Sequence, residues 1–305
     1  MTISIVIVNW NVKALLRDCL QSVFAGNCNP PPEVIVVDNA SADGSVEMVR
    51  TEFPQVTLIA ADENLGFARS SNLGATRATG DFIFLLNPDT RLHADTLCLL
   101  RDYLTAQPRA GVVAPQLLWA DGSIQSSRRR FPTLSTMLWE STLLEQCFPH
   151  NRAAARYRFE DIPPTETIAV DWAVGAALFL RREVWAQVGG LDESFFMYFE
   201  ETDWCRRVAN AGWEIHYLPA AKVIHYEGQS SGQVVAARMA RFQRSKIRYA
   251  EKWFGGRQAW AIRQFLRLTT AIQWTTEAAK WLLGHKRPLR RERMAAYRNL
   301  LEALR

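Results

Sequence analysis

The feature that most constrains the fold is an alternation of short apolar runs with helical patterns near the N-terminus. Ile3–Asn9 and Glu33–Asp38 are rich in β-branched residues and lack polar alternation, as expected for strands buried on both faces. Helical spacing of apolar residues is found in residues 12–25, 43–53 and 66–79, and further strands are expected at residues 56–60 and 81–86. This alternation predicts an α/β fold with a doubly wound, mostly parallel sheet flanked by helices.

Ligands of such sheets bind at the carboxyl ends of the parallel strands. The residues at or just beyond those ends are Asn9, Asp38–Ser41, Asn64–Phe67 and Asn87–Asp89. A carboxylate at Asp38 can accept a hydrogen bond from a pyrimidine N–H, although Asp38 and Ser41 could equally act only as helix caps. Gly66 stands at a loop-to-helix junction, where it either lets backbone N–H groups approach phosphate or simply eases a turn.

Asn87-Pro88-Asp89 directly follows the strand expected at residues 81–86. A divalent cation can neutralise a diphosphate leaving group, and hard cations prefer carboxylate oxygens. Asp89 is therefore a candidate metal ligand. His225 could complete the site, because imidazole and carboxylate together suit Mn²⁺ or Mg²⁺. The structural alternatives are an Asx-turn at residues 87–89 and a histidine with no ligand role.

An acidic and aromatic segment, residues 195–204 (FFMYFEETDW), sets Glu200, Glu201 and Asp203 beside five aromatic residues. Aromatic surroundings desolvate a carboxylate and raise its pKa toward the range of a general base. The alternative is the acidic first turn of a helix, which the helix dipole favours. That alternative explains the charges but not the aromatic residues, so the segment predicts the general base.

In order along the chain, these segments resemble glycosyltransferase family 2. The similarity runs over residues 1–232 in seven blocks: VIVNWN, VVDNAS-DGS, NLGFA-SSN, LLNPDT, the GA strand with GGLDE, FFMYFEETDWCRR and VIHYEGQS. Residues 111–132 and the basic C-terminal region resemble the bacterial rhamnosyltransferases that act on polyprenyl-diphosphate sugars. The resemblance implies a GT-A fold and inverting transfer of rhamnose from dTDP-rhamnose, a nucleotide diphosphate sugar donor, to a polyprenyl-diphosphate saccharide acceptor in cell-surface polysaccharide synthesis.

The resemblance also implies roles for individual residues. It assigns the nucleotide sugar to Val8, Asn9, Asp38, Asn64, Gly66, Asn72 and Asn87, the divalent cation to Asp89 and His225, and the acceptor side to Trp172, Gly175 and Ala176. Asn87 stands where the family has the first Asp of a D-x-D element. The family's base is the Asp of a Glu-Asp pair, and Glu200-Glu201 stands there, so Glu201 is the expected base and Asp203 the alternative.

Positive charge is concentrated in two places. Arg128 and Arg130 belong to a run of three arginines, which either holds a diphosphate or forms a solvated loop. Residues 1–235 hold 19 Lys/Arg and 27 Asp/Glu, a net charge of −8, whereas residues 236–305 hold 17 and 4, a net charge of +13. So basic a tail predicts a polyanionic partner.

The tail also carries Trp253, Trp260, Trp274 and Trp281 at multiples of seven residues. Tryptophan among cations is typical of a membrane-interface helix, although these side chains could instead pack the tail onto the catalytic domain. We therefore predict a GT-A domain at residues 1–235, with a nucleotide-sugar half (1–115) and an acceptor half (116–235). Residues 236–305 are predicted to form a basic helical extension, broken at Gly255–Gly256 and Pro288, that contacts an anionic membrane surface.

Other classes of protein fit less well. Five cysteines, odd in number and without a C-x-x-C pair, favour a reducing compartment over disulfides or a cysteine zinc site. With no signal peptide and no run near the ~20 apolar residues of a membrane span, we expect a cytoplasmic protein, peripheral on the inner face of the plasma membrane.

Asn9-Trp10-Asn11 replaces the G-x-G-x-x-G of a dehydrogenase, and no nucleic-acid-binding module is recognisable. A non-catalytic nucleotide-sugar-binding protein and a sugar nucleotidyltransferase remain the alternatives.

Overall fold

The computed structural model describes residues 1–148, 151–226 and 235–305, and the chain divides into two compact units. The first comprises Met1–Phe131, Arg158–Phe196 and Glu200–Ser230, and the second comprises Pro132–Tyr157, Met197–Phe199 and Ser231–Arg305. Residues 132–157 thus group with the C-terminal helices, whereas the sequence-based division assigned them to the acceptor half. Glu227–Ser230 of the VIHYEGQS block lie outside the described residues.

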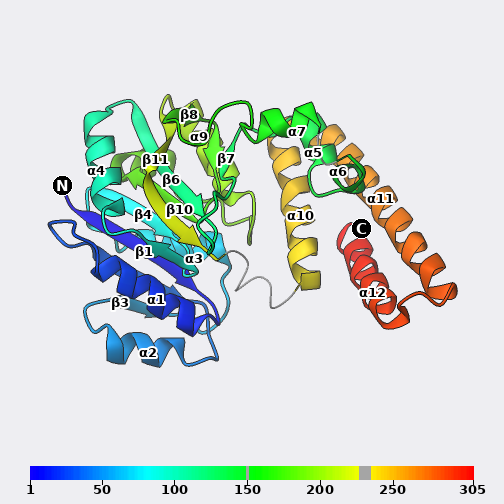
Figure 1. The fold of residues 1–305 in the computed structure, drawn as a ribbon, viewed down its shortest axis with the longest axis horizontal. Coiled ribbons are helices and arrows are strands. Elements are labelled where there is room, and N and C mark those ends of the chain that lie inside the picture. The colour runs from blue at the N-terminus through cyan, green and yellow to red at the C-terminus, as the bar shows by residue number, and fades with distance from the viewer. Residues whose placement is uncertain (149–150, 227–234) are drawn as a thin grey trace. The chain divides into compact units, whose positions relative to one another are not determined.

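The first unit is built on one nine-stranded sheet (Figure 1). Its strands are β1 (Ile3–Asn9), β2 (Glu33–Asp38), β3 (Thr57–Ala60), β4 (Phe82–Leu86), β5 (Thr90–Leu92), β6 (Ala110–Leu118), β8 (Ile168–Val170), β10 (Ala177–Arg181) and β11 (Glu214–His225). The order is β3-β2-β1-β4-β10-β6-β11-β5, with β8 paired to β11. Strands β1 to β4 are parallel to one another, and β6 is parallel to β11. Strand β10 runs antiparallel to both β4 and β6, and β5 and β8 run antiparallel to β11.

Helices flank this sheet: α1 (Lys13–Phe24), α2 (Ser45–Glu52), α3 (Phe67–Ala75), α4 (Thr96–Ala106), α8 (Arg182–Val188) and α9 (Glu200–Asn210). Ile5 and Ile7 of β1 share a core with residues of α1, α2 and α4. Val6, whose side chain points to the other face, meets Gly74 of α3, where an added Cβ would overlap it. Because both faces are covered, β1 is apolar at nearly every position, and the predicted α/β architecture is confirmed.

Two segments depart from the sequence pattern. The GA strand is two strands: β9 (Trp172–Ala173) pairs with β7 (Arg128–Arg129), and β10 begins at Ala177. Strand β6 continues past Ala114 to Leu118 and is buried throughout. Pro115 and Gln116 interrupt the apolar pattern there. The Gln116 amide is nevertheless satisfied, because it donates to Pro164 O and Tyr217 Oη, both at 3.0 Å.

The second unit is helical: α5 (Leu134–Trp139), α6 (Leu143–Cys147), α7 (Arg152–Tyr157), α10 (Val235–Phe254), α11 (Gly256–Leu282) and α12 (Arg287–Ala303). The predicted breaks are confirmed. Gly255 has φ +95° between α10 and α11, and Pro288 stands in the first turn of α12, where its missing N–H costs no helical bond. In the described part of the chain, no helix combines the length and apolarity needed to cross a membrane.

Buried polar groups fix the packing within this unit. The Lys246 ammonium donates to the carbonyls of Met137 and Glu140 at the end of α5, and burial lowers the pKa of Lys246 to about 8. Ser245 Oγ donates to Met197 O at 2.8 Å, and the Phe199 ring packs on Tyr249 with centroids 5.5 Å apart. These contacts hold residues 197–199 in the helical unit.

Candidate active site

The carboxyl ends of β1 and β2 form the first part of the site. Asn9 and Asp38 are register partners, both are buried, and Asn9 Nδ2 donates to Asp38 Oδ2 at 2.7 Å. The second oxygen, Asp38 Oδ1, accepts from the backbone N–H of Ser41 at 2.8 Å. Asn9 Oδ1 is buried without a hydrogen-bond partner among the described residues. The arrangement therefore offers a fixed carboxylate and a vacant acceptor, which suit a base N–H.

The loop Asn64–Gly66 borders this edge and is fixed on two sides. Asn64 Oδ1 accepts from the N–H of Gly66 at 3.0 Å, and Phe67 N donates to Phe196 O at 2.9 Å. Gly66 has φ +82°, and a Cβ there would lie 2.7 Å from the Phe196 ring and carbonyl. Only glycine fits both the turn and the close approach. The loop thus joins the nucleotide edge to the acidic, aromatic segment.

Two asparagines nearby differ from the sequence prediction. Asn72 was assigned to the nucleotide sugar, but its Nδ2 donates to Leu191 O at 2.9 Å and its Oδ1 accepts from Leu191 N at 2.8 Å. Its amide is occupied by the GGLDE loop, which argues against its assignment to the nucleotide sugar. Asn39, which was not assigned, is buried under the Gly66 loop and accepts from Ser70 Oγ at 2.6 Å. The sequence feature that could have identified Asn39 is its position in the Asp38–Ser41 segment, at the carboxyl end of β2.

The turn after β4 and the end of β11 form the second part of the site. His225 pairs with Thr90 in the β5–β11 ladder, and Tyr226 N donates to Asp89 O at 2.9 Å. This pairing sets His225 Nε2 3.5 Å from Asp89 Oδ1, with both side chains buried. Two residues 136 positions apart in the sequence are thereby neighbours, as the prediction of a shared site required.

The orientation of the His225 ring is fixed by Gln125, a buried residue that the sequence analysis did not assign. His225 Nδ1 lies 2.9 Å from Gln125 Oε1, and because a carbonyl oxygen only accepts, Nδ1 carries the proton. In the neutral ring, the lone pair of Nε2 then faces Asp89. A partner of this kind is what selects the ligating nitrogen of a metal-binding histidine.

These residues fit a divalent cation. A separation of 3.5 Å between Asp89 Oδ1 and His225 Nε2 allows both atoms to bind one ion at about 2.1 Å. Burial raises the pKa of the adjacent Cys19 to about 12, and hard cations prefer oxygen ligands to sulfur. Within the described ranges, no group of three or more His, Cys, Asp or Glu could hold a metal. Mg²⁺-type sites commonly use one or two protein ligands and complete their shell with substrate phosphate and water.

The N-terminus of α9 supplies the third part of the site. Glu201 is half-buried and lies against Gly175, where a Cβ would be 3.3 Å from its Cβ and Cγ. The neighbouring Ala176 O accepts from Asn87 N at 2.9 Å, so the turn between β9 and β10 links Glu201 to the Asn87–Asp89 turn. The break between these strands, which the sequence analysis missed, is thus part of the site.

The other two carboxylates of α9 are placed differently. Glu200 is buried, and burial first, then the charge of Glu201, raises the pKa of Glu200 well above its usual range. Asp203 is fully buried and forms an ion pair with Arg207 at 3.0 Å, while Arg207 also donates to Val188 O and Gly190 O. Asp203 therefore has a structural partner, which argues against its expected role as the alternative base.

The arginine run and Trp172 stabilise one another. Arg128 is buried, donates to the carbonyls of Phe159, Ile162 and Pro163, and stacks on Tyr217. These contacts argue against the assignment of Arg128 to a diphosphate, because three of its five N–H donors already bond backbone carbonyls. Arg130 pairs with Asp161 at 3.4 Å, and Trp172 Nε1 donates to Arg130 O at 2.9 Å. Trp172 thus braces the arginine loop, and Arg130 keeps a partly exposed guanidinium beside an exposed carboxylate.

Known proteins are similar to this chain in sequence and in fold. The sequence model of the family described as Glycosyl transferase family 2 matches residues 4–163. The chain is 32% identical over 257 residues to the N-acetylglucosaminyl-diphospho-decaprenol L-rhamnosyltransferase of Mycobacterium tuberculosis, covering 79% of this chain and 83% of that protein. It is 29% identical over 175 residues to the rhamnosyltransferase WbbL of Escherichia coli K12, covering 53% of this chain and 61% of that protein.

Solved structures show the same fold at low identity. The mannosyltransferase PcManGT from Pyrobaculum calidifontis, in complex with GDP-Man and Mn²⁺, has a TM-score of 0.57 at 17% identity, covering 99% of this chain and 85% of that chain. GalNAc-T7 with UDP, GalNAc and Mn²⁺ also has a TM-score of 0.57, at 16% identity, covering 73% of this chain and 43% of that chain. With the family match and the mycobacterial relative, the conclusion is that this chain is a glycosyltransferase and belongs to glycosyl transferase family 2.

Proposed function

We propose that this enzyme transfers rhamnose, with inversion, from dTDP-rhamnose to a polyprenyl-diphosphate-linked saccharide during cell-surface polysaccharide synthesis. The proposal rests on the mycobacterial relative, whose name states an N-acetylglucosaminyl-diphospho-decaprenol acceptor and a rhamnosyl group. The observation that carries the chemistry is the turn at Gly175–Ala176, which connects Glu201 to the Asn87–Asp89 turn opposite His225.

The donor is bound along the ends of β1, β2 and β4. The thymine N–H donates to the buried acceptors of Asn9 and Asp38, while Val8 and the Asn64–Gly66 loop line the nucleotide pocket. Asp89 and His225 would hold Mg²⁺ or Mn²⁺, which supplies charge neutralisation for the departing diphosphate. Gln125 keeps His225 Nε2 aimed at Asp89, so the two protein ligands are ordered before the donor arrives.

Glu201 takes the proton of the acceptor hydroxyl as its oxygen attacks the anomeric carbon, and the bond to the diphosphate breaks on the opposite face. A positioned base typically contributes ~10²–10⁴-fold to such a step. Two adjacent carboxylates in a partly dry site do not ionise equally. Burial first, and then the charge of Glu201, raises the pKa of Glu200, so Glu200 favours its protonated form and is disfavoured as the base.

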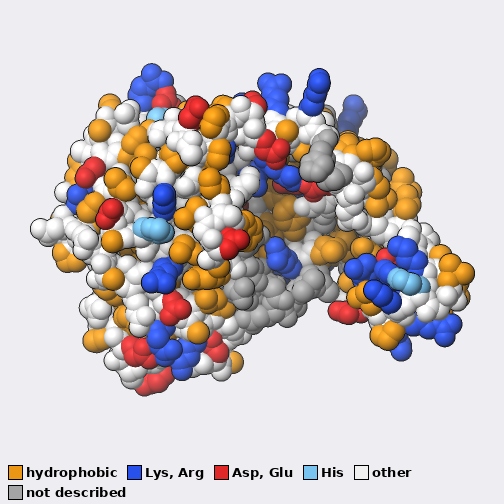
Figure 2. All heavy atoms as spheres, in the orientation of Figure 1, with side chains coloured by type: hydrophobic (Ala, Val, Ile, Leu, Met, Phe, Trp, Pro, Cys, Tyr) orange, Lys and Arg blue, Asp and Glu red, His pale blue; other side chains and the backbone are white. Residues whose placement is uncertain are grey.

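Because the acceptor is linked to a lipid, the enzyme works at a membrane. The helical unit binds peripherally to the anionic membrane surface on the cytoplasmic face. From Trp260 to Leu282, one face of α11 is uncharged and turned away from the buried residues. We call it the outer stripe, and it consists of Trp260, Gln264, Leu268, Ala271, Thr275, Ala279 and Leu282. Trp260, Leu268 and Leu282 are 64%, 61% and 70% exposed. Figure 2 shows hydrophobic side chains along the edge formed by α11 and basic side chains over α12. Apolar contact flanked by cations is the composition that binds membrane interfaces.

The decisive experiment is turnover with a panel of nucleotide sugars and a short, water-soluble analogue of the diphosphate-linked acceptor. We expect transfer from dTDP-rhamnose that stops in EDTA and resumes with Mn²⁺ or Mg²⁺. Full activity in EDTA would remove the metal from the proposal. Tight donor binding with no transfer to any acceptor would favour the alternative of a non-catalytic nucleotide-sugar-binding protein.

A further inference from the structure

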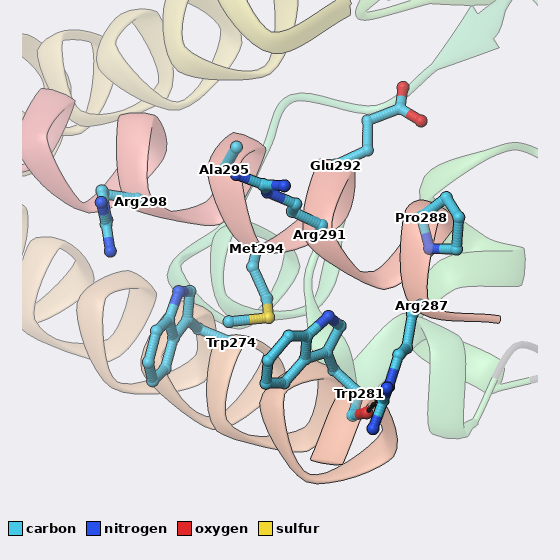
Figure 3. Close-up of a pocket in the computed structure, with 9 residues that line it drawn as sticks. All are labelled: Trp274, Trp281, Arg287, Pro288, Arg291, Glu292, Met294, Ala295 and Arg298. Atoms are coloured by element: carbon cyan, nitrogen blue, oxygen red, sulfur yellow. Dashed lines mark hydrogen bonds between the residues drawn. The ribbon is translucent and has the colours of Figure 1, made fainter. Parts of the chain in front are cut away.

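A groove between α11 and α12 has a composition that the transfer reaction does not require. It has a volume of about 1060 Å³. Figure 3 shows Trp274 and Trp281 side by side on α11, with Met294 of α12 between them. The two tryptophans are seven residues apart and therefore lie on nearly the same face of the helix. This gives the groove an apolar floor large enough for part of a lipid chain.

Three arginines of α12 line the same groove: Arg287, Arg291 and Arg298. All three are exposed. Arg287 is held in place, because its guanidinium lies 5.5 Å from the Trp281 ring centroid and its Nε donates to Trp281 O at 3.2 Å. Glu292 is the only acid of the lining, and its carboxylate points away from the groove (Figure 3).

The neighbouring arginines show that this charge is not balanced internally. Glu277, the buried acid of this helix pair, is paired with Arg290 at 2.7 Å and Arg293 at 3.6 Å, and Lys280 is 3.8 Å away. For the groove arginines, by contrast, no carboxylate of residues 1–148, 151–226 or 235–305 lies within 4 Å. The groove thus combines an apolar floor with a concentrated positive charge that has no acidic partner in the described chain.

We propose that this groove binds an anionic membrane phospholipid, with the phosphate on the α12 arginines and an acyl segment against Trp274 and Trp281. Guanidinium groups pair well with phosphate oxygens, and indole rings provide apolar contact area. Leu282, the last residue of α11, and Leu283, which follows it, are 70% and 85% exposed and are positioned to enter the bilayer. The inference rests on the proposed membrane association and deepens it, because it replaces a diffuse attraction by a defined lipid site.

The test is a titration of the full chain with monomeric dihexanoyl-phosphatidylglycerol, followed by tryptophan fluorescence. We expect saturable binding that weakens at least tenfold in Arg287→Gln/Arg291→Gln/Arg298→Gln. The matched control, Arg152→Gln/Arg248→Gln/Arg305→Gln, removes three exposed arginines outside the groove and should bind as wild type does. Trp274→Phe/Trp281→Phe should lose most of the fluorescence response, and circular dichroism verifies that each variant is folded.

Several outcomes would overturn the site. Equal affinity of the groove and control variants for the lipid would exclude a role of the three groove arginines in binding. Equal affinity of the wild type for dihexanoyl-phosphatidylcholine and dihexanoyl-phosphatidylglycerol would exclude recognition of net charge. Saturation by inorganic phosphate alone, or displacement by a short polyprenyl diphosphate or an oligonucleotide, would assign the groove to another ligand. Wild-type sedimentation with phosphatidylglycerol vesicles tests the membrane proposal separately, and turnover on the soluble acceptor tests the transfer reaction.

Discussion

Charge is used in opposite ways by the two units. In the sheet unit, Asp38, Asp89, Glu200 and His225 are buried, and each has a fixed neighbour in the fold. In the helical unit, most cations of α11 and α12 are exposed, among them Arg287, Arg291 and Arg298. Electrostatic interactions are strong and weakly screened in a buried site, and weak and strongly screened at a surface. The first arrangement serves chemistry at a fixed point, and the second serves association over an area.

This difference predicts that the two activities can be removed independently. Variants of the sheet unit should change turnover on a soluble acceptor and leave vesicle binding intact. Variants of the helical unit should weaken vesicle binding and leave turnover on a soluble acceptor intact. Their effect on vesicle binding should fade with added salt. A variant that changed both activities equally would contradict this division.

The largest effect is expected from Glu201→Gln, which keeps the size of the side chain and removes its basicity. Turnover should fall at least a hundredfold while donor affinity and vesicle binding stay nearly unchanged. Asp203→Asn is the comparison variant. It should lower the free energy of unfolding, because the ion pair with Arg207 is lost, but turnover per folded molecule should change little. If the Asn variant is inactive and the Gln variant normal, Asp203 is the base.

A somewhat smaller effect is expected from Gln125→Leu, which removes the acceptor that orients His225. Outer-shell partners of metal ligands typically contribute ~10–100-fold to metal affinity or activity. The Mn²⁺ concentration that restores half of the activity after EDTA treatment should therefore rise, and excess Mn²⁺ should recover much of the rate. Asp89→Ala should not be rescued in this way. A Gln125→Leu enzyme with wild-type Mn²⁺ dependence would show that the contact is only structural.

Leu282→Ser/Leu283→Ser tests the other side of the comparison. Both side chains are largely exposed, so the change should leave the fold intact while removing apolar contact with lipid. We expect sedimentation with phosphatidylglycerol vesicles to weaken about tenfold or more, with turnover on the soluble acceptor unchanged. Unchanged sedimentation would remove this turn from the membrane surface.

The smallest effect concerns the stability of the sheet unit. Because the pKa of Glu200 is raised in the folded chain, the folded state holds that proton more tightly than the unfolded state does. Wild-type stability should therefore fall as pH rises from the ordinary pKa of Glu toward the raised value. Glu200→Gln should flatten this dependence and raise the free energy of unfolding on the order of 1 kcal/mol at pH 8, measured by urea denaturation. A less stable variant at pH 8 would contradict the raised pKa of Glu200.

The sequence determined the architecture of the first half of the chain. Strands such as Ile3–Asn9 are apolar at nearly every position because helices cover both faces of the sheet. The helix breaks at Gly255 and before Pro288 follow from local backbone preferences. Strand-end positions also identified Asn9, Asp38 and Asp89, because the carboxyl ends of parallel strands meet at one edge. These features depend on periodicity and on single residues, which a sequence displays directly.

Only the tertiary structure decided which candidates share a site and which are already occupied. The β5–β11 ladder brings His225 to Asp89, and Gln125 reaches His225 across 100 positions of sequence. Asn72 and Arg128 carry suitable groups, yet distant backbone atoms already use them, at Leu191 and at residues 159–163. Hydrogen-bond partners of this kind depend on non-local strand and loop pairing, and no local pattern of residue types encodes that pairing.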